Sequence, residues 1–265
     1  MLIEHQHNTV TYMTAPNINT SHAFTTRHGG VSSGIYTSMN LGQNLGDDIK
    51  TVKRNYEILC ETLNITPDDI IVSGQVHGTH IRVVKQDDRG KLFSSDASER
   101  IFADGMITND NTLALMVYAG DCVPILLHDP IQGVIGAVHA GWRGTAADIA
   151  GAAIRKMQTE FSCSPAHIHA AIGPCISKCC FETDHDVADD LRNALGDDAE
   201  SCITPQDLKY MIDLKEANRL LLTRSGISNI SISNECTACL CDKYWSHRKT
   251  KGKRGSQAAI IMKGP

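Results

Sequence analysis

The sequence has no apolar run long enough to cross a lipid bilayer. Its longer apolar stretches are residues 112–120 and 134–140, whereas a spanning helix needs roughly 18 to 20 such residues. Residues 1–10 also lack the basic start and the apolar core of a secretory signal. We therefore expect a protein that is neither exported nor inserted in a membrane.

Basic residues do not outnumber acidic residues in the sequence. Lys and Arg number 25 against 30 Asp and Glu, which gives a net charge of −5 with histidine neutral. No global positive field therefore draws this protein to nucleic acid or to an anionic membrane. We expect small molecules as its partners and a monomer or homodimer as its assembly.

Cysteine is too scarce for a disulfide scaffold. Ten cysteines in 265 residues fall well below the roughly 8 to 10% that marks such proteins. A chain without an export signal is expected in a reducing compartment. We interpret the cysteines as thiols or metal ligands of a cytoplasmic protein.

Nothing in the sequence separates two halves of the chain. We find no Pro- or Ser-rich linker and no internal repeat. Hydrophobic residues make up 42% and charged residues 21%, a composition typical of soluble proteins with a substantial buried core. We therefore predict a single domain over residues 1–265.

Hydrophobic periodicity predicts a mixed fold. After an irregular, Gly-rich start, helical spacing of apolar residues predicts helices over residues 47–63, 145–161, 183–195 and 213–224. Short apolar runs between turn residues predict strands at residues 81–84, 104–108, 113–118, 123–127, 133–139 and 258–262, and near Ile230. Because the central strands follow one another without intervening helices, the pattern favours an α+β fold, a layered β-sandwich-like core flanked by helices.

Two turns beside apolar runs carry reactive residue types. The segment HAGWRG at residues 139–144 puts His139 at a strand end and Arg143 in a turn that opens a helix, where backbone N–H groups can meet an anion. The segment GDCVP at residues 120–124 puts Cys122 between two apolar runs. The structural alternatives stay open, because such a His is often a plain turn residue and a buried Cys is often a small hydrophobe.

A third candidate is His77, in the bend QVHG at residues 75–78. His77, Cys122 and His139 all lie at strand edges of the same central region, where separate loops can converge. His and Cys are ligands that zinc and copper prefer, and three protein ligands leave the open position of a catalytic site. The separations of 45 and 17 residues match no local zinc-finger spacing, so the metal site is a hypothesis at this point.

Other segments compete for the same chemistry. A structural zinc at the remaining cysteines is the weaker hypothesis, because the C-x-x-C among them has no matching pair at finger or ribbon spacing. The basic stretch 243–254 is interpreted as a solvated loop before the last strand, in which Arg248 is able to bind phosphate by its fork. The cysteines in question are Cys175, Cys179, Cys180, Cys236, Cys239 and Cys241.

An ordered set of motifs resembles a known family. The chain from about residue 20 to its end is similar to the bacterial multicopper polyphenol oxidase (laccase-domain) family, now described as purine nucleoside phosphorylases. The matching blocks are residues 26–32 (TRHGGVS), 36–42 (YTSMNLG), 75–78 (QVHG), 103–104 (AD), 121–124 (DCVP), 139–144 (HAGWRG), 172–174 (IGP), 236–237 (CT) and 246–248 (SHR).

The resemblance implies a layered core of α/β/β/α type and zinc held by His77, Cys122 and His139. It also implies phosphorolysis of adenosine, inosine and S-methyl-5′-thioadenosine, together with deamination of adenosine. Copper and laccase activity are the older attribution of the family. Ala119, Gly120 and His247 depart from the usual pattern of the blocks, which puts the fine substrate preference in doubt.

A zinc-centred mechanism gives roles to further residues. Zinc makes water nucleophilic near neutral pH, as attack at the amino-bearing purine carbon requires. Asp121 is expected to orient a ligand or to take part in proton transfer, with a turn-forming role as the alternative. The expected substrate-binding residues are Arg27, Asn40, Gln75, Arg143 and Arg248, with the three arginines as candidates for phosphate.

Three alternatives remain. The first is a copper-dependent, laccase-like polyphenol oxidase, which a single three-ligand site suits poorly because reduction of O₂ to water needs four electrons. The second is a metal-free cysteine hydrolase with Cys122 as nucleophile and His139 as base. The third is a metal-binding module without catalytic activity.

Overall fold

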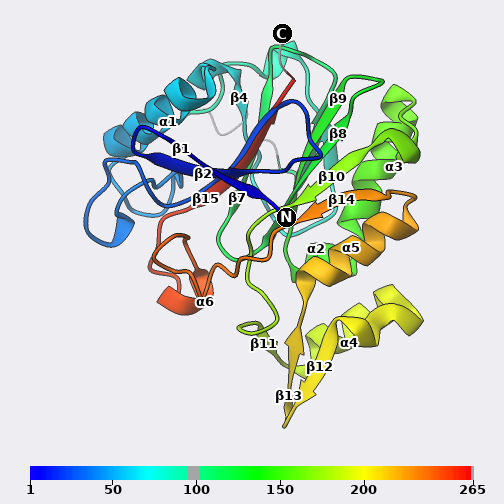
Figure 1. Ribbon diagram of the computed structural model, residues 1–265. Helices are drawn as coiled ribbons and strands as arrows, with labels where there is room; N and C mark the ends of the chain where they lie inside the picture. The colour runs from blue at the N-terminus through cyan, green and yellow to red at the C-terminus, as the bar shows by residue number, and fades with distance from the viewer. Residues whose placement is uncertain (95–101, 264–265) are drawn as a thin grey trace.

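Two six-stranded sheets form the centre of the computed structural model, which describes residues 1–94 and 102–263 (Figure 1). In the first sheet the order is β1 (Ile3–His7), β2 (Val10–Thr14), β3 (Ser21–Thr25), β15 (Gln257–Met262), β7 (Ala114–Ala119) and β4 (Ile70–Ile71). In the second it is β14 (Asn229–Ile232), β10 (His169–Ile172), β8 (Val123–Asp129), β9 (Val134–Ala140), β6 (Gly105–Thr108) and β5 (Ile81–Val83). Both sheets mix antiparallel with parallel neighbours.

Three apolar cores hold four layers together. Phe24 and Leu115 of the first sheet pack with Leu126 and Ile135 of the second in the core between the sheets. A second core joins the outer face of the first sheet to α1 (Ile49–Leu63). A third joins the second sheet to α3 (Ile149–Phe161), α4 (His185–Leu195) and α5 (Leu214–Arg224) (Figure 1). The α/β/β/α layering and the α+β class are therefore confirmed.

Strands β8 and β9 are buried along their whole length. A strand covered on both faces reads as a continuous apolar run, which is why both were predictable. Their antiparallel register pairs Pro124 with His139, and β6 pairs Gly105 with Val138. As a result, the turn that holds Cys122, the end of β9 with His139, and Asp104 before β6 meet at one edge of the second sheet.

The predicted helix over residues 145–161 is wrong in its first turn. The chain forms a short α2 (Trp142–Ala146), breaks, and resumes as α3 (Ile149–Phe161). The break lies at Asp148, whose backbone is left-handed with a φ of 56° and whose carboxylate accepts a hydrogen bond from Gly151 N at 3.0 Å. Asp tolerates this conformation better than most residues and makes a good N-cap, so the break has a local cause.

The amino-terminal residues and a small third sheet were not predicted. Strands β1, β2 and β3 occupy the segment that the sequence marks as irregular. The third sheet has the order β11 (Glu182–Thr183), β13 (Lys209–Ile212) and β12 (Ile203–Gln206), and it lies with α4 at the lower end of the view (Figure 1). Thr183, predicted as helical, belongs to β11.

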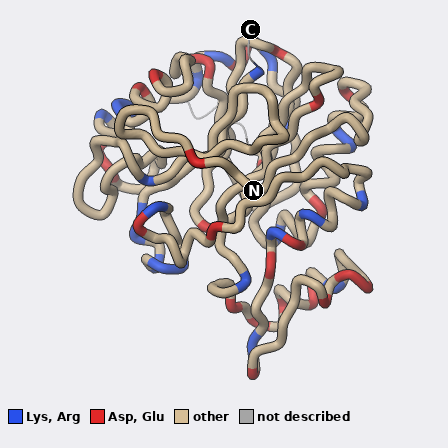
Figure 2. The backbone as a smooth tube through the Cα atoms, in the orientation of Figure 1, with Lys and Arg blue, Asp and Glu red and all other residues tan. Residues whose placement is uncertain are grey.

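The basic stretch 243–254 is not wholly a solvated loop. It contains the short α6 (His247–Thr250), and the side chains of Tyr244 and Trp245 before it are buried. Lys and Arg positions are interspersed with Asp and Glu along the chain trace (Figure 2). Short 3₁₀ helices also occur at η1 (Gly34–Tyr36), η2 (Pro67–Asp69), η3 (Gln86–Asp88), η5 (Pro165–His167) and η6 (Gly196–Ser201).

Within residues 1–94 and 102–263, no helix is both long enough and apolar enough to cross a membrane. Strands β4 and β10 were also not predicted, whereas the other strands of the two large sheets from β5 onward, with α1, α4 and α5, match predicted elements to within a few residues. The single domain over residues 1–265 stays a prediction.

Candidate active site

A cavity of about 670 Å³ opens beside the edge where β6, β8 and β9 meet. His77, Cys122 and His139 contribute to one part of its lining, and Lys53 and Phe93 contribute to another. A cavity of this volume falls within the range of small-molecule sites.

The structure brings His77, Cys122 and His139 together. Cys122 Sγ lies 3.9 Å from His77 Nε2, and the rings of His77 and His139 meet edge to face with their centroids 4.9 Å apart. One ligand atom from each of the three residues lies within 4.8 Å of the other two. His139 is buried, Cys122 is half-buried and His77 is exposed, so the trio reaches from the protein interior to the cavity surface.

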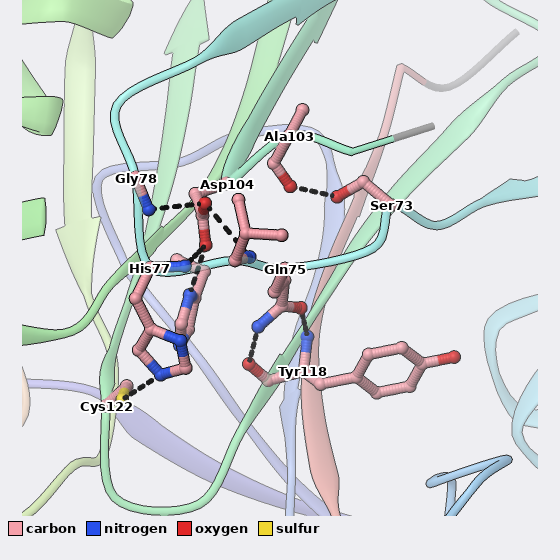
Figure 3. A network of polar contacts seen from close by, with 10 residues as sticks. Ser73, Gln75, His77, Gly78, Ala103, Asp104, Tyr118 and Cys122 are labelled. Atoms are coloured by element: carbon pink, nitrogen blue, oxygen red, sulfur yellow. Dashed lines mark hydrogen bonds and ion pairs between the residues drawn. The ribbon is translucent and has the colours of Figure 1, made fainter. Parts of the chain in front are cut away.

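Asp104 orients two members of this trio through hydrogen bonds. Its fully buried carboxylate accepts hydrogen bonds from the backbone N–H groups of His77 at 2.9 Å and Gly78 at 2.7 Å, and it pairs with His139 Nδ1 at 2.9 Å. Figure 3 shows the carboxylate facing the 76–78 bend, with the sulfur of Cys122 next to the ring of His77 (Figure 3). One carboxylate therefore fixes both the bend that carries His77 and the orientation of His139.

Gly141 allows the close approach of the three side chains. A Cβ atom on Gly141 would lie 2.8 Å from His77 Cδ2 and 3.3 Å from Cys122 Sγ. The backbone beside the trio is also unusual, because His77 has a φ of 62° and Asp121 a φ of 134°. Non-glycine residues in these regions are strained, and such strain clusters at functional sites.

The electrostatics of the trio favour a thiolate. Burial raises the pKa of Cys122, but hydrogen bonds and charge from His139 and His77 outweigh burial and lower this pKa to about 6. Burial lowers the pKa of His139, but Asp104 and Cys122 outweigh it and raise this pKa to about 9. Cys122 is therefore a ready metal ligand or nucleophile near neutral pH.

The donor set fits a zinc ion. Zinc binds Cys sulfur at about 2.3 Å and His nitrogen at about 2.0–2.1 Å in tetrahedral sites. The bond from His139 Nδ1 to Asp104 leaves Nε2 of that ring for a metal, and a carboxylate behind a ligating histidine is the usual arrangement around such ions. Three protein ligands leave one tetrahedral position for substrate or water.

The expected substrate-binding residues lie in different places. Gln75 lines the cavity, although its amide holds the backbone of Tyr118 through bonds of 2.7 and 3.0 Å. Arg27 donates to the carbonyls of Thr37 and Cys241 and stacks over Trp245. The side chains of Gln75 and Arg27 are therefore already hydrogen-bonded to the backbone.

The other three candidates lie apart from the described cavity lining. Asn40 is fully buried and accepts from the N–H groups of Gly42 and Ser256. Arg143 is exposed and stacks on Trp142, its neighbour in the chain. Arg248 is exposed and donates to the carbonyls of Cys180 and Glu182.

Asp121 joins the cavity wall to two later segments of the chain. Its carboxylate accepts from Thr237 Oγ1 at 2.6 Å and from Arg248 N at 2.6 Å. These contacts hold the turn immediately before Cys122. The geometry thus supports an orienting role for Asp121 over a direct one in proton transfer.

Arg254 is a charged cavity residue that sequence reasoning missed. It lines the cavity, and one guanidinium nitrogen donates to Gly255 O at 2.7 Å. Its buried Nε has no hydrogen-bond partner among residues 1–94 and 102–263. Burial lowers the pKa of Arg254, while the charges of Asp121 and Cys122 raise it. The signal in the sequence was an arginine directly before the last strand, but pairing of β15 with β7 is needed to bring it to Gly120 and Cys122.

The sequence of this chain matches a family model over almost its whole length. That model, described as multi-copper polyphenol oxidoreductase laccase, matches residues 21–264. The chain belongs to this family. The resemblance predicted from the motifs is therefore confirmed.

Members of the family carry the names of enzymes. The chain is 39% identical over 242 residues to purine nucleoside phosphorylase YlmD of Geobacillus stearothermophilus, covering 89% of this chain and 88% of that one. It is 31% identical over 241 residues to adenosine deaminase RL5 of an unknown prokaryotic organism, covering 89% and 91%. The crystal structure of the Geobacillus YlmD superposes with a TM-score of 0.91 at 35% identity and full coverage of both chains.

Proposed function

We propose that this protein is a zinc-dependent purine nucleoside phosphorylase that acts on adenosine, inosine and S-methyl-5′-thioadenosine, with a second activity as an adenosine deaminase. The observation that carries the proposal is the His77, Cys122 and His139 trio in the lining of a cavity that also contains Arg254. The names of relatives such as YlmD and RL5 support the same two reactions.

His77, Cys122 and His139 would hold the zinc ion. A bound zinc ion supplies Lewis acidity, the property that makes water nucleophilic near neutral pH. Asp104 keeps the Nδ1 proton on His139 through the bond of 2.9 Å, which leaves Nε2 as a lone-pair donor. Gly141 lets the side chains of His77 and Cys122 approach each other without a steric block.

Arg254 is the residue we assign to phosphate. Its guanidinium is partly buried and lies next to Gly120, and its buried Nε donor is unpaired within the part of the chain that the structure describes. Arginine binds phosphate through paired N–H donors. In phosphorolysis a phosphate oxygen forms a bond to C1′ of the ribose while the C1′–N9 bond breaks, and the purine leaves with the bonding electrons and takes up a proton. A positive charge beside the incoming phosphate stabilises this exchange.

Aromatic side chains provide a surface for the purine. Phe93 and Phe102 both line the cavity, and 60% of the Phe102 surface is exposed. Stacking of a base on an aromatic ring contributes about 1–3 kcal/mol. In deamination, water adds to the amino-bearing carbon of adenosine and ammonia leaves, so the base must be fixed against such a surface.

The test is steady-state turnover of adenosine and inosine with and without phosphate. We expect Arg254→Met to raise the KM for phosphate at least tenfold in inosine phosphorolysis and to change adenosine deamination much less. Arg248→Met is the matched control, because Arg248 lies apart from the cavity lining, and it should leave the KM for phosphate nearly unchanged. Equal effects of the two variants would overturn the assignment of Arg254.

The thiolate character of Cys122 favours a second candidate, a cysteine hydrolase with His139 as base. Zinc-free protein that keeps its full activity and forms a covalent adduct on Cys122 would support that candidate. Oxygen uptake with a phenol by copper-loaded protein would instead support a polyphenol oxidase, the activity named in the family description.

We propose a cellular location and binding partners for the protein on the same basis. All ten cysteines are free thiols in the structure, which supports a location in the reducing cytoplasm. The proposed partners are purine nucleosides and phosphate, without nucleic acid, and a monomer or homodimer stays the prediction for the assembly.

A further inference from the structure

A second cluster of metal-ligating side chains lies outside the cavity. It consists of four cysteines, Cys179, Cys180, Cys236 and Cys239, and the sulfur atoms of all four lie within 4.8 Å of one another. They come from two segments separated by about 60 residues in the chain. The nearby Cys175 and Cys241 do not belong to the cluster.

We propose that Cys179, Cys180, Cys236 and Cys239 form a closed zinc site that joins the 175–181 and 234–241 segments. The sulfur of Cys239 lies 3.5 Å from that of Cys179 and 3.4 Å from that of Cys180, and these last two are 3.8 Å apart. Zinc–sulfur bonds of about 2.3 Å in a tetrahedron place neighbouring sulfurs about 3.8 Å apart. These three separations are close to the edge of such a tetrahedron, and the sulfur of Cys236 lies within 4.8 Å of the other three.

The spacing of the four sulfur atoms favours a single metal ion over a disulfide or an iron–sulfur cluster. A disulfide needs two sulfurs at about 2.05 Å and uses only one pair, whereas here one sulfur has two neighbours at nearly equal distance. An iron–sulfur cluster interposes several atoms between its cysteines, and this group of four is too tight to surround one. Four thiolates around one position are typical of structural zinc.

The surroundings of Cys236 support a ligand role. Its sulfur is buried and accepts a hydrogen bond from Ser177 N at 3.3 Å, across the two segments. Donors of this kind orient ligating atoms and offset their negative charge.

A buried lysine also lies beside the cluster. Lys215 is 7% exposed, and its ammonium donates to Ser177 Oγ at 2.8 Å and Glu235 O at 2.7 Å, one on each of the two segments. Both acceptors are neutral, although a buried ammonium normally has a negative partner. Zinc with four thiolates carries a net charge of −2, which provides that partner.

A closed site has a structural role, because four protein ligands leave no position for a substrate. The two segments it joins support the wall of the cavity. Thr237 donates to the carboxylate of Asp121, and Ile176 N donates to the Asp121 carbonyl at 3.0 Å. The proposed ion therefore holds the loops that position the turn before Cys122.

Zinc content of protein purified without added metal tests the site. The measurement is made in Cys122→Ala protein, which weakens the cavity site, so that a failure of the proposed function does not affect the result. We expect about one zinc per chain in this background and an at least tenfold loss on adding Cys239→Ser. Cys241→Ser is the control and should retain the zinc.

Alkylation of the wild-type chain keeps the test informative where Cys239→Ser does not fold. Cys179 and Cys239 are exposed, so free thiols there would react at once with iodoacetamide. We expect both to be protected until a chelator is added, and cobalt added in place of zinc to give the strong charge-transfer absorption of a tetrahedral thiolate site. Immediate alkylation, a disulfide found without added oxidant, or equal zinc in Cys239→Ser and Cys241→Ser would each overturn the proposal.

Discussion

Asp104 contacts two of the three candidate metal ligands of the active site. It pairs with one candidate ligand and holds the backbone of another. The sequence motifs pointed to the candidate ligands but not to the orienting role of Asp104, because that role depends on β6, β8 and β9 ending at the same place. Candidate ligands follow from residue types, whereas the groups that orient them follow from the fold.

The substitution Asp104→Asn tests this orienting role. An amide adds a donor where the structure presents three backbone N–H groups and an imidazole, so the bend and the His139 tautomer both lose their support. We expect the affinity for zinc to fall about 10- to 100-fold, measured by competition with a chromogenic chelator.

Asp69→Asn is the matched control for that substitution. Asp69 is also a buried carboxylate with a backbone N–H partner and a cationic partner, Thr66 N and Arg89. It should lower stability without changing the affinity for zinc. An unchanged affinity in Asp104→Asn would show that Asp104 does not orient the ligands.

At the scale of elements, apolar runs made the central strands predictable. Strands β8 and β9 have inward and outward faces that are both buried, so the runs stand out in the sequence. Strand β1 is exposed along most of its length, and its polar residues carry no such run. It forms because β2 pairs with it over five residues, a tertiary contact that the local sequence does not show.

The break between α2 and α3 depends on Asp148. Asp148→Ala removes the cap of α3 and leaves a Cβ-bearing residue without a compensating bond at a φ of 56°. We expect a loss of about 1 kcal/mol in the free energy of unfolding, measured by urea denaturation. Asp148→Asn, which caps and tolerates this backbone, should cost less; equal losses would mean that the cap is unimportant.

For the whole molecule, the layers bring histidines into the interior between the sheets. Burial lowers the pKa of His22 and of His128, and His22 and His169 lower that of His128 further. In the unfolded chain these side chains take up protons below about pH 6.5. The folded state resists protonation, so its free energy of unfolding should fall as the pH drops from about 6.5 to the lower folded values.

Thermal unfolding of the wild type and His22→Gln across this pH range checks the prediction. His22 Nε2 accepts a hydrogen bond from Ala15 N at 2.7 Å, so the variant should be less stable at pH 7. Its stability should nevertheless decline less steeply between pH 6.5 and 5 than that of the wild type. Parallel curves for the two proteins would show that His22 does not contribute to the pH dependence.

Hydrophobic patterns predicted the mixed, layered class of the fold. Residue types at strand ends suggested His77, Cys122 and His139 as candidate ligands, and the resemblance to the family implied the same three residues. The position of Arg254 could not be predicted, since strand β15 must first lie beside β7. The same limit applies to the four-cysteine cluster. The C-x-x-C at residue 236 has its partners about 60 residues earlier in the chain, far from any zinc-finger spacing.

We propose that the cavity catalyses phosphorolysis with zinc bound at His77, Cys122 and His139. The most direct measurement is phosphorus NMR of wild-type and Cys122→Ala protein incubated with inosine and inorganic phosphate. We expect a new ribose 1-phosphate signal that grows with the wild type, equals the hypoxanthine released, and is lost with Cys122→Ala. Hypoxanthine with free ribose and no phosphate ester would show that the reaction is hydrolysis, and an undiminished signal with Cys122→Ala would show that the zinc site is not required.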